Sequence, residues 1–230
     1  MSDFVPVLSA RVGKKNSRAL ETYVADGGYA SWRKVLAGSK SGEWTPAKVT
    51  DVVKASGLRG RGGAGFPTGM KWTFVPPKEK RGGKPVYLLC NADESEPGTF
   101  KDRVLIEQDP HQILEGMMLA SFALDVKHAY IYIRGEMVRG AEILNAAIDE
   151  AYAAGLLGTD VLGSGLDLDI TVHRAPGPTS AARRRRSSRA SRATVACPAS
   201  SPRTSPRRRG STSSPPSSTT SRRSPTSRGS

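Results

Sequence analysis

The order of apolar and polar residues along this chain predicts three β-strands. The first is the short apolar run in residues 83–90, GKPVYLLC, which follows a glycine and a proline and is typical of a buried strand. Residues 128–135, HAYIYIRG, alternate and are rich in Tyr and Ile, and residues 167–174, DLDITVHR, alternate as well. These patterns place three strands at wide spacing in the chain.

Helical patterns precede the first predicted strand. Asn16 and Ser17 are candidate caps for a helix that begins near Arg18. A short amphipathic segment follows at residues 29–38, YASWRKVLAG, and we expect Gly38 to end it.

A third helix is predicted to begin at Thr45-Pro46. Proline is favoured in the first helical turn, because the backbone N–H that it lacks would have no hydrogen-bond partner in the helix there. Gly57 should stop this helix. Two longer helices are expected between the strands: residues 101–124, bent at Asp109-Pro110, and residues 137–158, ended by a glycine cap.

Strands that alternate with helices predict an α/β fold with a largely parallel sheet. In such sheets, ligands bind outside the carboxyl ends of the strands. The acidic turn NADESEPGTF follows Cys90 directly, at the end of the first predicted strand. We therefore expect a binding site there, with the glycine-rich segment that precedes the strand close by.

That glycine-rich segment, residues 57–74, reads GLRGRGGAGFPTGMKWTF. Glycines let backbone N–H groups approach a ligand closely, because no Cβ intervenes. The segment also holds basic residues and aromatic rings, which favour an anion joined to a flat ring system, as in a nucleotide or flavin. It contains no GK[ST] sequence, and it follows a helix rather than a strand, so a structural turn remains the alternative. The basic and aromatic residues are Arg59, Arg61, Lys71, Phe66, Trp72 and Phe74.

The second motif is the acidic turn, which holds three carboxylates within four positions. Carboxylates are strong acceptors for ribose or ribityl hydroxyls and for amide groups. A solvated acidic turn is the simpler interpretation, and a metal site is disfavoured because the nearest histidine in the sequence is His111. The polar residues of the turn are Asn91, Asp93, Glu94, Ser95 and Glu96.

Charge is distributed very unevenly over the 230 residues, whose formal net charge is +14. Residues 175–230 hold 13 of the 35 basic residues and no acidic one, so residues 1–174 carry the other 22 against 21 acidic residues. The first part has the composition of one globular domain. The tail contains no Leu, Ile, Met or aromatic residue and is predicted to be disordered, because it cannot bury enough apolar surface.

The remaining composition narrows the class of protein. Cys90 and Cys197 form neither a disulfide framework nor a metal-binding spacing, and Cys90 is interpreted as a buried thiol. His111 and His128 are interpreted as structural residues. The sequence shows no membrane span and no signal peptide, so we expect a cytoplasmic protein whose contact with a membrane is indirect.

The two motifs together, GLRGRGGAGFPTGMKW and then NADESEPGTFKDR, resemble the NADH-oxidising flavoprotein subunit of respiratory complex I, the F-type subunit of NADH–quinone oxidoreductase. The resemblance covers about residues 1–174. It implies a Rossmann-like FMN-binding domain, hydride transfer from NADH to FMN, and onward electron transfer through iron–sulfur clusters to quinone. It also implies assembly with other subunits of the peripheral arm, especially the small [2Fe–2S] subunit of the E type, on the cytoplasmic side of the inner membrane.

The resemblance also assigns the site residues, and it assigns no protein side chain to the hydride transfer itself. The glycine loop would lie against FMN and the incoming nucleotide, and Lys71 would bind FMN. The polar turn would hold the ribityl chain and ring edge, while Phe66 and Phe74 would stack on the adenine of NADH near Glu96. The remaining implied cofactor-binding residues are Gly60, Arg61, Gly62, Gly63, Gly65, Asn91, Asp93, Glu94 and Ser95.

After His173-Arg174 the chain departs from the family, which continues with a segment like GAGAYICGEET. A tail read one base out of frame accounts for this, because Ala175 to Ala193 can then be decoded as GAGPYICGEETALLESLEG and Pro216 to Pro225 as TVVNNVETLA. As written, the chain lacks the cysteine ligands of the family's [4Fe–4S] cluster. We therefore expect it to be truncated, to bind FMN weakly or not at all, and to pass no electrons onward.

Two alternatives remain at this point. Within the enzymes, flavin subunits of NAD-reducing hydrogenases and of some formate dehydrogenases look similar. In another class, the arginine-rich tail is typical of a nucleic-acid-binding arm. The tail lacks aromatic residues for base stacking, so we predict no nucleic-acid partner.

Overall fold

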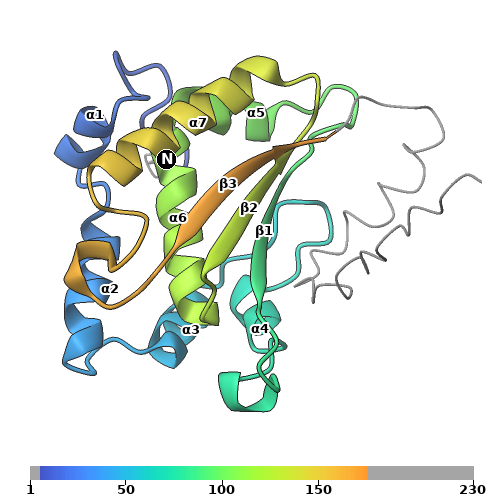
Figure 1. Cartoon of the computed structure of the whole chain (residues 1–230). Coiled ribbons are helices and arrows are strands. Elements are labelled where there is room, and N and C mark those ends of the chain that lie inside the picture. The colour runs from blue at the N-terminus through green and yellow to red at the C-terminus, as the bar shows by residue number, and fades with distance from the viewer. Residues whose placement is uncertain (1–5, 176–230) are drawn as a thin grey trace, which may run out of the picture. The chain divides into compact units, whose positions relative to one another are not determined.

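The computed structural model describes residues 6–175, which form a parallel sheet with helices packed on it (Figure 1). The predicted out-of-frame, disordered tail lies almost wholly outside the described residues. The elements are α1 (Leu20–Ala25), α2 (Ala30–Lys40), α3 (Pro46–Ala55), α4 (Thr68–Trp72), the 3₁₀ turn η1 (Lys78–Lys80), β1 (Tyr87–Ala92), α5 (Lys101–Gln108), α6 (Pro110–Leu124), β2 (His128–Ile133), α7 (Val138–Ala153), the 3₁₀ turn η2 (Val161–Gly163) and β3 (Asp169–Arg174).

The sheet has the order β1-β2-β3, and both neighbouring pairs are parallel. Tyr87 pairs with His128, which pairs with Asp169, and the register then continues without a break to the ends of the strands. This confirms the predicted α/β class with a parallel sheet. All three strands end at the same edge, where the acidic turn leaves β1.

Both crossovers step in the same direction across the sheet, and they bring α6 and α7 to the same face (Figure 1). Ala129, Ile131 and Ile133 of β2 point into this face and are essentially inaccessible to solvent. Leu114 of α6 and Leu144 of α7 are buried against them in the same core. Burial of such side chains contributes about 1.5–3 kcal/mol each.

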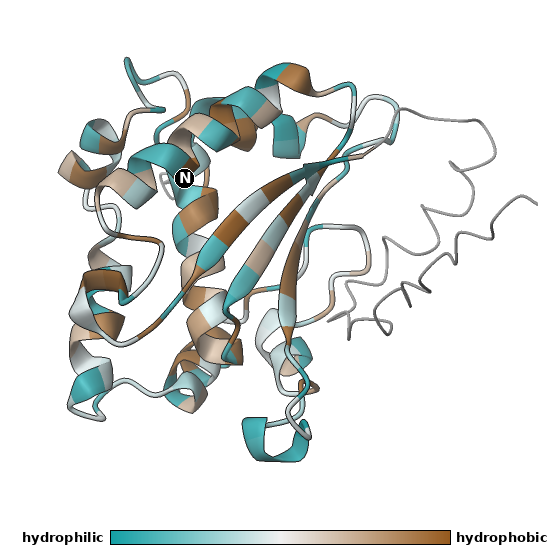
Figure 2. Ribbon diagram, viewed as in Figure 1, coloured by the Kyte–Doolittle hydropathy of each residue, from teal (hydrophilic) through white to brown (hydrophobic). Residues whose placement is uncertain are grey.

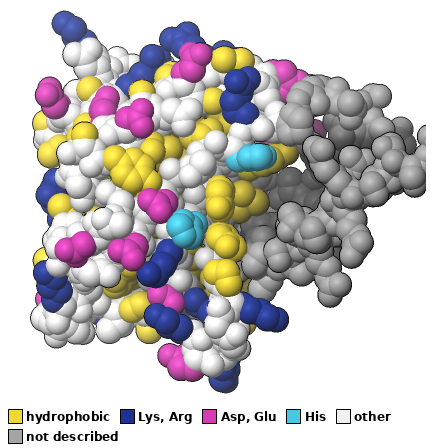
Figure 3. Space-filling view, viewed as in Figure 1, with side chains coloured by type: hydrophobic (Ala, Val, Ile, Leu, Met, Phe, Trp, Pro, Cys, Tyr) yellow, Lys and Arg dark blue, Asp and Glu magenta, His cyan; other side chains and the backbone are white. Residues whose placement is uncertain are grey.

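The opposite face of the sheet carries the alternating polar and aromatic positions of the strands. Tyr87 lies 6.0 Å from Tyr130 and Tyr132 lies 5.7 Å from His173, measured between ring centroids. Figure 2 shows the resulting alternation of hydropathy along the strands, and Figure 3 shows hydrophobic and histidine side chains together on this face. The period-2 pattern seen in the sequence is therefore a difference between two faces of one sheet.

Several predicted helix boundaries are confirmed. Thr45 caps α3, where its hydroxyl oxygen accepts a hydrogen bond from the Lys48 N–H at 3.2 Å. The predicted bend at Asp109-Pro110 is the junction between α5 and α6. The helix predicted over residues 137–158 is shorter than expected: α7 ends at Ala153, and Gly155, at φ +68°, follows it.

Two predictions near the N-terminus are wrong. The first helix begins at Leu20 rather than near Arg18, and neither Asn16 nor Ser17 caps it, because Ala19 is the cap residue. The second helix continues through Gly38 to Lys40. Gly38 is instead buried inside this helix, where a Cβ would lie 2.4 Å from the Trp44 ring, so close packing rather than helix termination explains the glycine.

The first strand is also shifted by a few residues from its prediction. It begins at Tyr87 rather than in the glycine and proline of residues 83–85, and it continues through Asn91 to Ala92. Asn91 is therefore the penultimate residue of β1 and not part of the turn. Only the residues that pair with β2 can belong to the strand, and this pairing cannot be read from a single apolar run.

A buried polar cluster joins α1 and α2 to α6. The Glu115 carboxylate accepts hydrogen bonds from the Tyr23 hydroxyl at 2.6 Å, from the Tyr29 N–H at 2.9 Å and from the Trp32 N–H at 3.3 Å. The Tyr29 hydroxyl in turn lies 2.9 Å from Nδ1 of His111, which is fully buried. This cluster satisfies its polar groups internally, as buried groups require.

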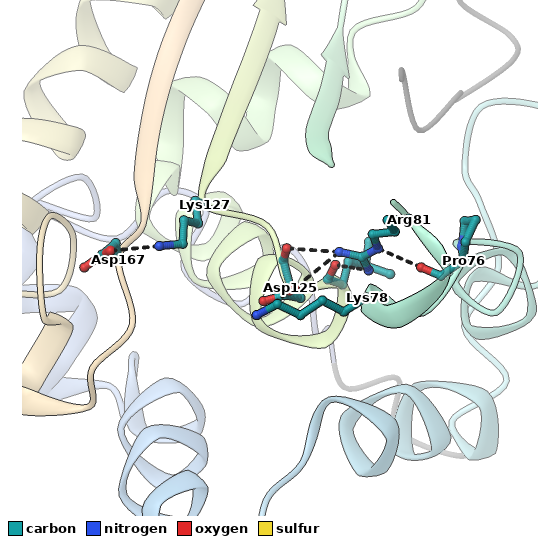
Figure 4. A network of polar contacts seen from close by, with 7 residues as sticks. Pro76, Lys78, Arg81, Asp125, Lys127 and Asp167 are labelled. Carbon is teal, nitrogen blue, oxygen red and sulfur yellow. Dashed lines mark hydrogen bonds and ion pairs between the residues drawn. The ribbon is translucent and has the colours of Figure 1, made fainter. Parts of the chain in front are cut away.

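A second network joins η1 to the end of α6 (Figure 4). The Arg81 guanidinium donates to the Pro76 carbonyl at 2.7 Å, to the Leu124 carbonyl at 2.9 Å and to the Asp125 carbonyl at 3.4 Å. Two of these acceptors are carbonyls at the carboxyl end of α6, which have no partner within the helix. Arg81 thereby holds the chain between α4 and β1 against the body of the domain.

Candidate functional site

The glycine loop, residues 58–68, folds back on itself before α4. The Gly60 N–H donates to the Phe66 carbonyl at 2.9 Å, and the Thr68 N–H donates to the Leu58 carbonyl at 2.8 Å. Arg59 and Pro67 form an antiparallel bridge between these two bonds. The loop is thus closed at its base, while its glycines are at the exposed tip.

The glycines at the tip differ in why they are needed. Gly63 has φ +100°, a conformation that strongly favours glycine. Gly62 does not have a positive φ, and a Cβ built on it would meet nothing within 4 Å. The described structure therefore gives no conformational or packing reason for glycine at position 62, and the close approach of a ligand would supply one.

Two cations of this region have no partner in residues 6–175. Arg61 is exposed on the loop, and Lys71 is half-buried in α4. Burial lowers the pKa of the Lys71 ammonium below its ordinary value. A half-buried cation without a counter-ion is well suited to receive an anionic group.

Two aromatic rings of the predicted set lie together and one does not. The Phe66 and Phe74 rings are 6.0 Å apart, and their residues are 44 % and 68 % exposed. Trp72 instead packs against both apolar clusters of the domain. The structure therefore leaves Phe66 and Phe74 accessible to a planar ligand, while Trp72 packs against the core.

The acidic turn, residues 93–98, begins directly after β1. Asn91 Oδ1 accepts a hydrogen bond from the Asp93 N–H at 3.1 Å, which shapes the exit from the strand. The Asp93 and Glu96 carboxylates have no hydrogen-bond or ion-pair partner in the described part of the chain, and neither does the Ser95 hydroxyl. The turn thus offers acceptors at the sheet edge where ligands of α/β folds bind.

Glu94 behaves differently from its neighbours in the turn. Its two carboxylate oxygens accept hydrogen bonds from the Asp102 N–H at 3.0 Å and the Arg103 N–H at 3.1 Å, at the start of α5. The Lys101 ammonium is 3.9 Å away. The sequence carries no signal for this contact, because Glu94 lies seven residues before the first residue of α5 and therefore outside the N-cap position of local capping motifs.

The glycine loop precedes β1 in the chain, and the acidic turn follows it. The loop and α4 precede the strand, and in Figure 1 the loop is drawn beside β1, away from α7. Among residues 6–175, no hydrogen bond or ion pair joins the loop to residues 93–98. The two motifs therefore share β1 as their common support but make no direct polar contact with each other.

Close packing of α4 on α3 positions Lys71. Gly69 is buried in α4, and a Cβ on it would lie 2.6 Å from the Lys54 backbone nitrogen in α3. Only glycine permits this approach of the two backbones. In the sequence Gly69 is one more glycine of the glycine-rich segment, but its role is to dock the helix that carries Lys71.

The other candidate residues have structural surroundings. Cys90 packs against the core, and burial raises the pKa of its thiol to about 11, so it is not a reactive thiolate. His111 is buried within the polar cluster, whereas His128 is exposed at the start of β2. No group of three or more potential metal ligands occurs in residues 6–175.

A hollow of about 460 Å³ lies away from both motifs, between residues 14–19 and α7. Its polar lining includes Lys14, Arg18 and Glu150, and Glu150 already accepts the Leu20 N–H at 2.8 Å. No residue of the glycine loop or the acidic turn lines it.

None of the described helices combines the length and apolar character needed to cross a bilayer.

The donor set fits a phosphorylated flavin. Gly62 leaves room for a ligand at the loop, Lys71 and Arg61 lack counter-ions among residues 6–175, and Asp93 lacks a donor there. An anionic phosphate needs the space at Gly62 and the unpaired cations, and the hydroxyls of a ribityl chain can donate to Asp93.

Comparison with known proteins identifies the family. The Nuo51 FMN-binding domain matches residues 53–182. The second of the NADH-quinone oxidoreductase F subunits of Rhizobium meliloti (strain 1021) is 51 % identical over 174 residues, which are 76 % of this chain and 39 % of that protein. The corresponding F subunit of Escherichia coli (strain K12) is 47 % identical over 158 residues, which are 69 % of this chain and 34 % of that protein.

Solved structures agree with this assignment. The crystal structure of an NAD⁺-reducing [NiFe]-hydrogenase in the air-oxidized state matches with a TM-score of 0.52 and 29 % identity, over 75 % of this chain and 25 % of the hydrogenase chain. The chain spans less than two fifths of the length of the curated relatives named above. The family match covers more than half of the present sequence, and the chain belongs to the family of the Nuo51 FMN-binding domain.

Proposed function

We propose that this chain is the FMN-binding part of an NADH dehydrogenase flavoprotein, the F-type subunit of complex I. In this proposal the complete protein transfers hydride from NADH to FMN and passes electrons through iron–sulfur clusters to quinone. The observation that carries it is Lys71, a half-buried cation without a counter-ion among the described residues, held beside a glycine loop. A phosphorylated flavin would supply the missing negative charge.

The residues of the glycine loop and of α4 bind the anionic end of the cofactor. Gly60, Gly62, Gly63 and Gly65 let the backbone N–H groups of the loop approach it, and Arg61 adds positive charge at the exposed tip. Lys71 donates a charge-assisted hydrogen bond from a less hydrated position, where such a bond is stronger.

The acidic turn orients the cofactor from the carboxyl end of β1. Asn91, Asp93 and Ser95 accept or donate hydrogen bonds to the ribityl hydroxyls and the ring edge, whereas both oxygens of Glu94 already accept N–H groups of α5. Bound FMN supplies the hydride-accepting chemistry, while the protein provides binding, orientation and exclusion of water.

NADH binding involves the exposed aromatic pair. Phe66 and Phe74 present two rings 6.0 Å apart to solvent, and we assign them to stacking on the adenine. Glu96 has no partner among the described residues and is available to the ribose hydroxyls of the nucleotide.

Partners follow from the same proposal. The chain would assemble with other peripheral-arm subunits, especially a small [2Fe–2S] subunit of the E type, and would reach the cytoplasmic face of the membrane only through them. A [4Fe–4S] cluster is held by four cysteine ligands, and this sequence has two cysteines. In this proposal that cluster would belong to a longer form of the protein.

A second candidate is the flavin subunit of an NAD-reducing hydrogenase or formate dehydrogenase. The likeness to the NAD⁺-reducing hydrogenase structure favours it, whereas the named NADH-quinone oxidoreductase relatives favour complex I. The neighbouring genes distinguish the two, because one set encodes quinone-reductase subunits and the other a [NiFe] or formate-oxidising subunit.

The written tail decides whether this particular polypeptide can be active. We propose that residues 175–230 are read out of frame, and all of them except Ala175 lie outside the described residues. Resequencing the gene across codons 170–235 tests this, and a missing or extra base near codon 175 is the expected result. A confirmed frame would contradict it, and salt-dependent binding of duplex DNA by the 230-residue chain would then support the nucleic-acid alternative.

Titration with FMN tests the binding function directly. The quenching of FMN fluorescence is measured for the 230-residue chain and for the frame-restored protein, with riboflavin as the matched ligand that lacks the phosphate. We expect saturable binding of FMN to the frame-restored protein, weaker binding to the written chain, and a clear preference over riboflavin in both. Equal affinity for FMN and riboflavin would contradict the role given to Lys71 and the loop.

A further inference from the structure

The Glu94 carboxylate links the exit of β1 to the start of α5. One oxygen accepts the Asp102 N–H at 3.0 Å, the other accepts the Arg103 N–H at 3.1 Å, and only 4 % of the side chain is exposed. These N–H groups belong to the first turn of the helix, where no carbonyl of the helix is available to accept them. Both acceptor atoms of Glu94 are therefore engaged within the protein.

The helix that Glu94 holds is firmly fixed in the domain. Ile106 of α5 is 2 % exposed and belongs to the main core. A Cβ on Gly140 of α7 would lie only 3.2 Å from the Ile106 side chain, so α5 and α7 pack closely. A turn bound to α5 is thereby bound to the core rather than left to move with solvent.

The neighbouring acidic residues show the contrast. Asp93 directly precedes Glu94, and Glu96 follows it by two residues. Neither of these two carboxylates has a partner in the described part of the chain. The engaged residue lies between the two free ones. This arrangement fixes the path of the turn through Glu94 while it leaves the other carboxylates available to a ligand.

We propose that Glu94 is a positioning residue, which holds the acidic turn on α5 so that Asp93, Ser95 and Glu96 face the cofactor site. The role rests on the proposed function of that site, but the anchor itself is a property of this chain alone. Glu94 acts through its neighbours and does not need to touch the cofactor.

The variant Glu94→Gln separates anchoring from charge. Glutamine has the same length, but its amide offers one oxygen acceptor, and its NH₂ group would face the second helix N–H donor. One of the two bonds is lost and the other retained. Asp102→Asn removes a negative charge at the same helix end without altering the backbone N–H groups that Glu94 binds, so it is the matched control.

Amide hydrogen exchange of the 230-residue protein is the first measurement. We expect Glu94→Gln to increase the exchange rate of the Asp102 or Arg103 amide by about tenfold, and to shift the amide resonances of Asp93, Ser95 and Glu96. Asp102→Asn and Glu96→Gln should leave the exchange of the Arg103 amide within about twofold of wild type. Unchanged exchange and unchanged turn resonances in Glu94→Gln would overturn the proposal.

FMN titration of the frame-restored protein is the second measurement. Glu94→Gln should raise the dissociation constant of FMN about tenfold, with a midpoint of thermal unfolding close to that of Asp102→Asn, whose affinity stays near wild type. An unchanged affinity, despite altered exchange, would overturn the positioning role. If wild type itself fails to bind FMN, the proposed function fails, while the exchange experiment still decides whether Glu94 anchors the turn.

Discussion

The polar cluster around Glu115 and the acidic turn after β1 contain the same residue type in opposite situations. Glu115 accepts hydrogen bonds from Tyr23, Tyr29 and Trp32 inside the domain, so its carboxylate is fully used by the fold. In the turn, Asp93 and Glu96 carry carboxylates that no described residue binds. Polar groups that satisfy each other hold the domain together, and polar groups left unpaired at the sheet edge are available to a ligand.

The same contrast separates the cations. Arg11 donates to Asp109 at 2.7 Å, and Arg81 binds the end of α6, so both stabilise the fold. Lys71 and Arg61 have no such partner among residues 6–175. Mutations in the first region should change stability, and mutations in the second should change binding.

The largest expected effect is on stability, from Glu115→Ala. The change leaves one buried hydroxyl and two buried N–H groups without an acceptor, and it should lower the free energy of unfolding by about 3 kcal/mol or more. Urea denaturation followed by circular dichroism measures this. The exposed Glu142→Gln on α7 is the control and should change stability by less than about 0.5 kcal/mol. A small effect of Glu115→Ala would show that water replaces the lost acceptor.

The next effect is on binding, from Lys71→Met. Loss of a charge-assisted hydrogen bond should weaken FMN binding by the frame-restored protein about 10- to 100-fold. Stability should stay unchanged or rise slightly, because methionine is more easily buried than an unpaired ammonium. Fluorescence titration and thermal unfolding measure the two quantities. Lost binding together with a lowered unfolding midpoint would instead indicate a structural role for Lys71.

His111 predicts a pH dependence that belongs to the fold and not to the site. Burial lowers the pKa of this imidazole. As pH falls through about 6.5, His111 therefore becomes protonated in the unfolded chain while it stays neutral in the folded chain. The free energy of unfolding should therefore fall as pH drops below about 6.5, by up to about 1.4 kcal/mol per pH unit.

His111→Gln should flatten this slope, whereas His173→Gln, at an exposed position in β3, should leave it intact. Urea denaturation at about pH 7.5, 6.5 and 5.5 measures the slope of each protein. An unchanged slope in His111→Gln would assign the pH dependence to other groups.

The smallest effect compares two neighbouring glycines. Gly62→Ala meets no atom within 4 Å and needs no positive φ, so stability should stay level or rise by about 0.5 kcal/mol, while FMN binding weakens. Gly63→Ala, at φ +100°, should lower stability by about 1 kcal/mol. Parallel thermal unfolding and FMN titration distinguish them. Unchanged binding in Gly62→Ala would remove the argument for a ligand close to this backbone.

Much of the fold could be predicted because it depends on local patterns. The three strands, the proline and threonine that open α3, and the break at Asp109-Pro110 all depend on neighbouring residues. The wrong boundaries involve residues outside the element concerned. Gly38 lies inside its helix, where the Trp44 ring beyond the helix end leaves no room for a Cβ, and β1 extends to Ala92 because β2 offers partners there. Tertiary contacts overrode the local signal in both cases.

For the candidate site, the sequence predicted which residues take part but not which of them are paired or packed within the protein. It grouped Trp72 with Phe66 and Phe74, and it grouped Glu94 with Asp93 and Glu96. The structure packs Trp72 against the core, and both oxygens of Glu94 accept hydrogen bonds from α5. Spacing along the chain cannot show which of several similar side chains finds a partner, because those partners lie on other elements.

The sequence by itself therefore determined the α/β class, the parallel sheet, the family and the two motifs on either side of β1. Periodicity, turn residues and short motifs are local properties of the chain, so they can be recognised without knowledge of its tertiary contacts. The tertiary structure decided which charges are paired, which glycines are needed for packing, and which ring packs against the core. These properties depend on close contacts between segments far apart in the chain, such as Gly69 against Lys54, which exist only once the chain is folded.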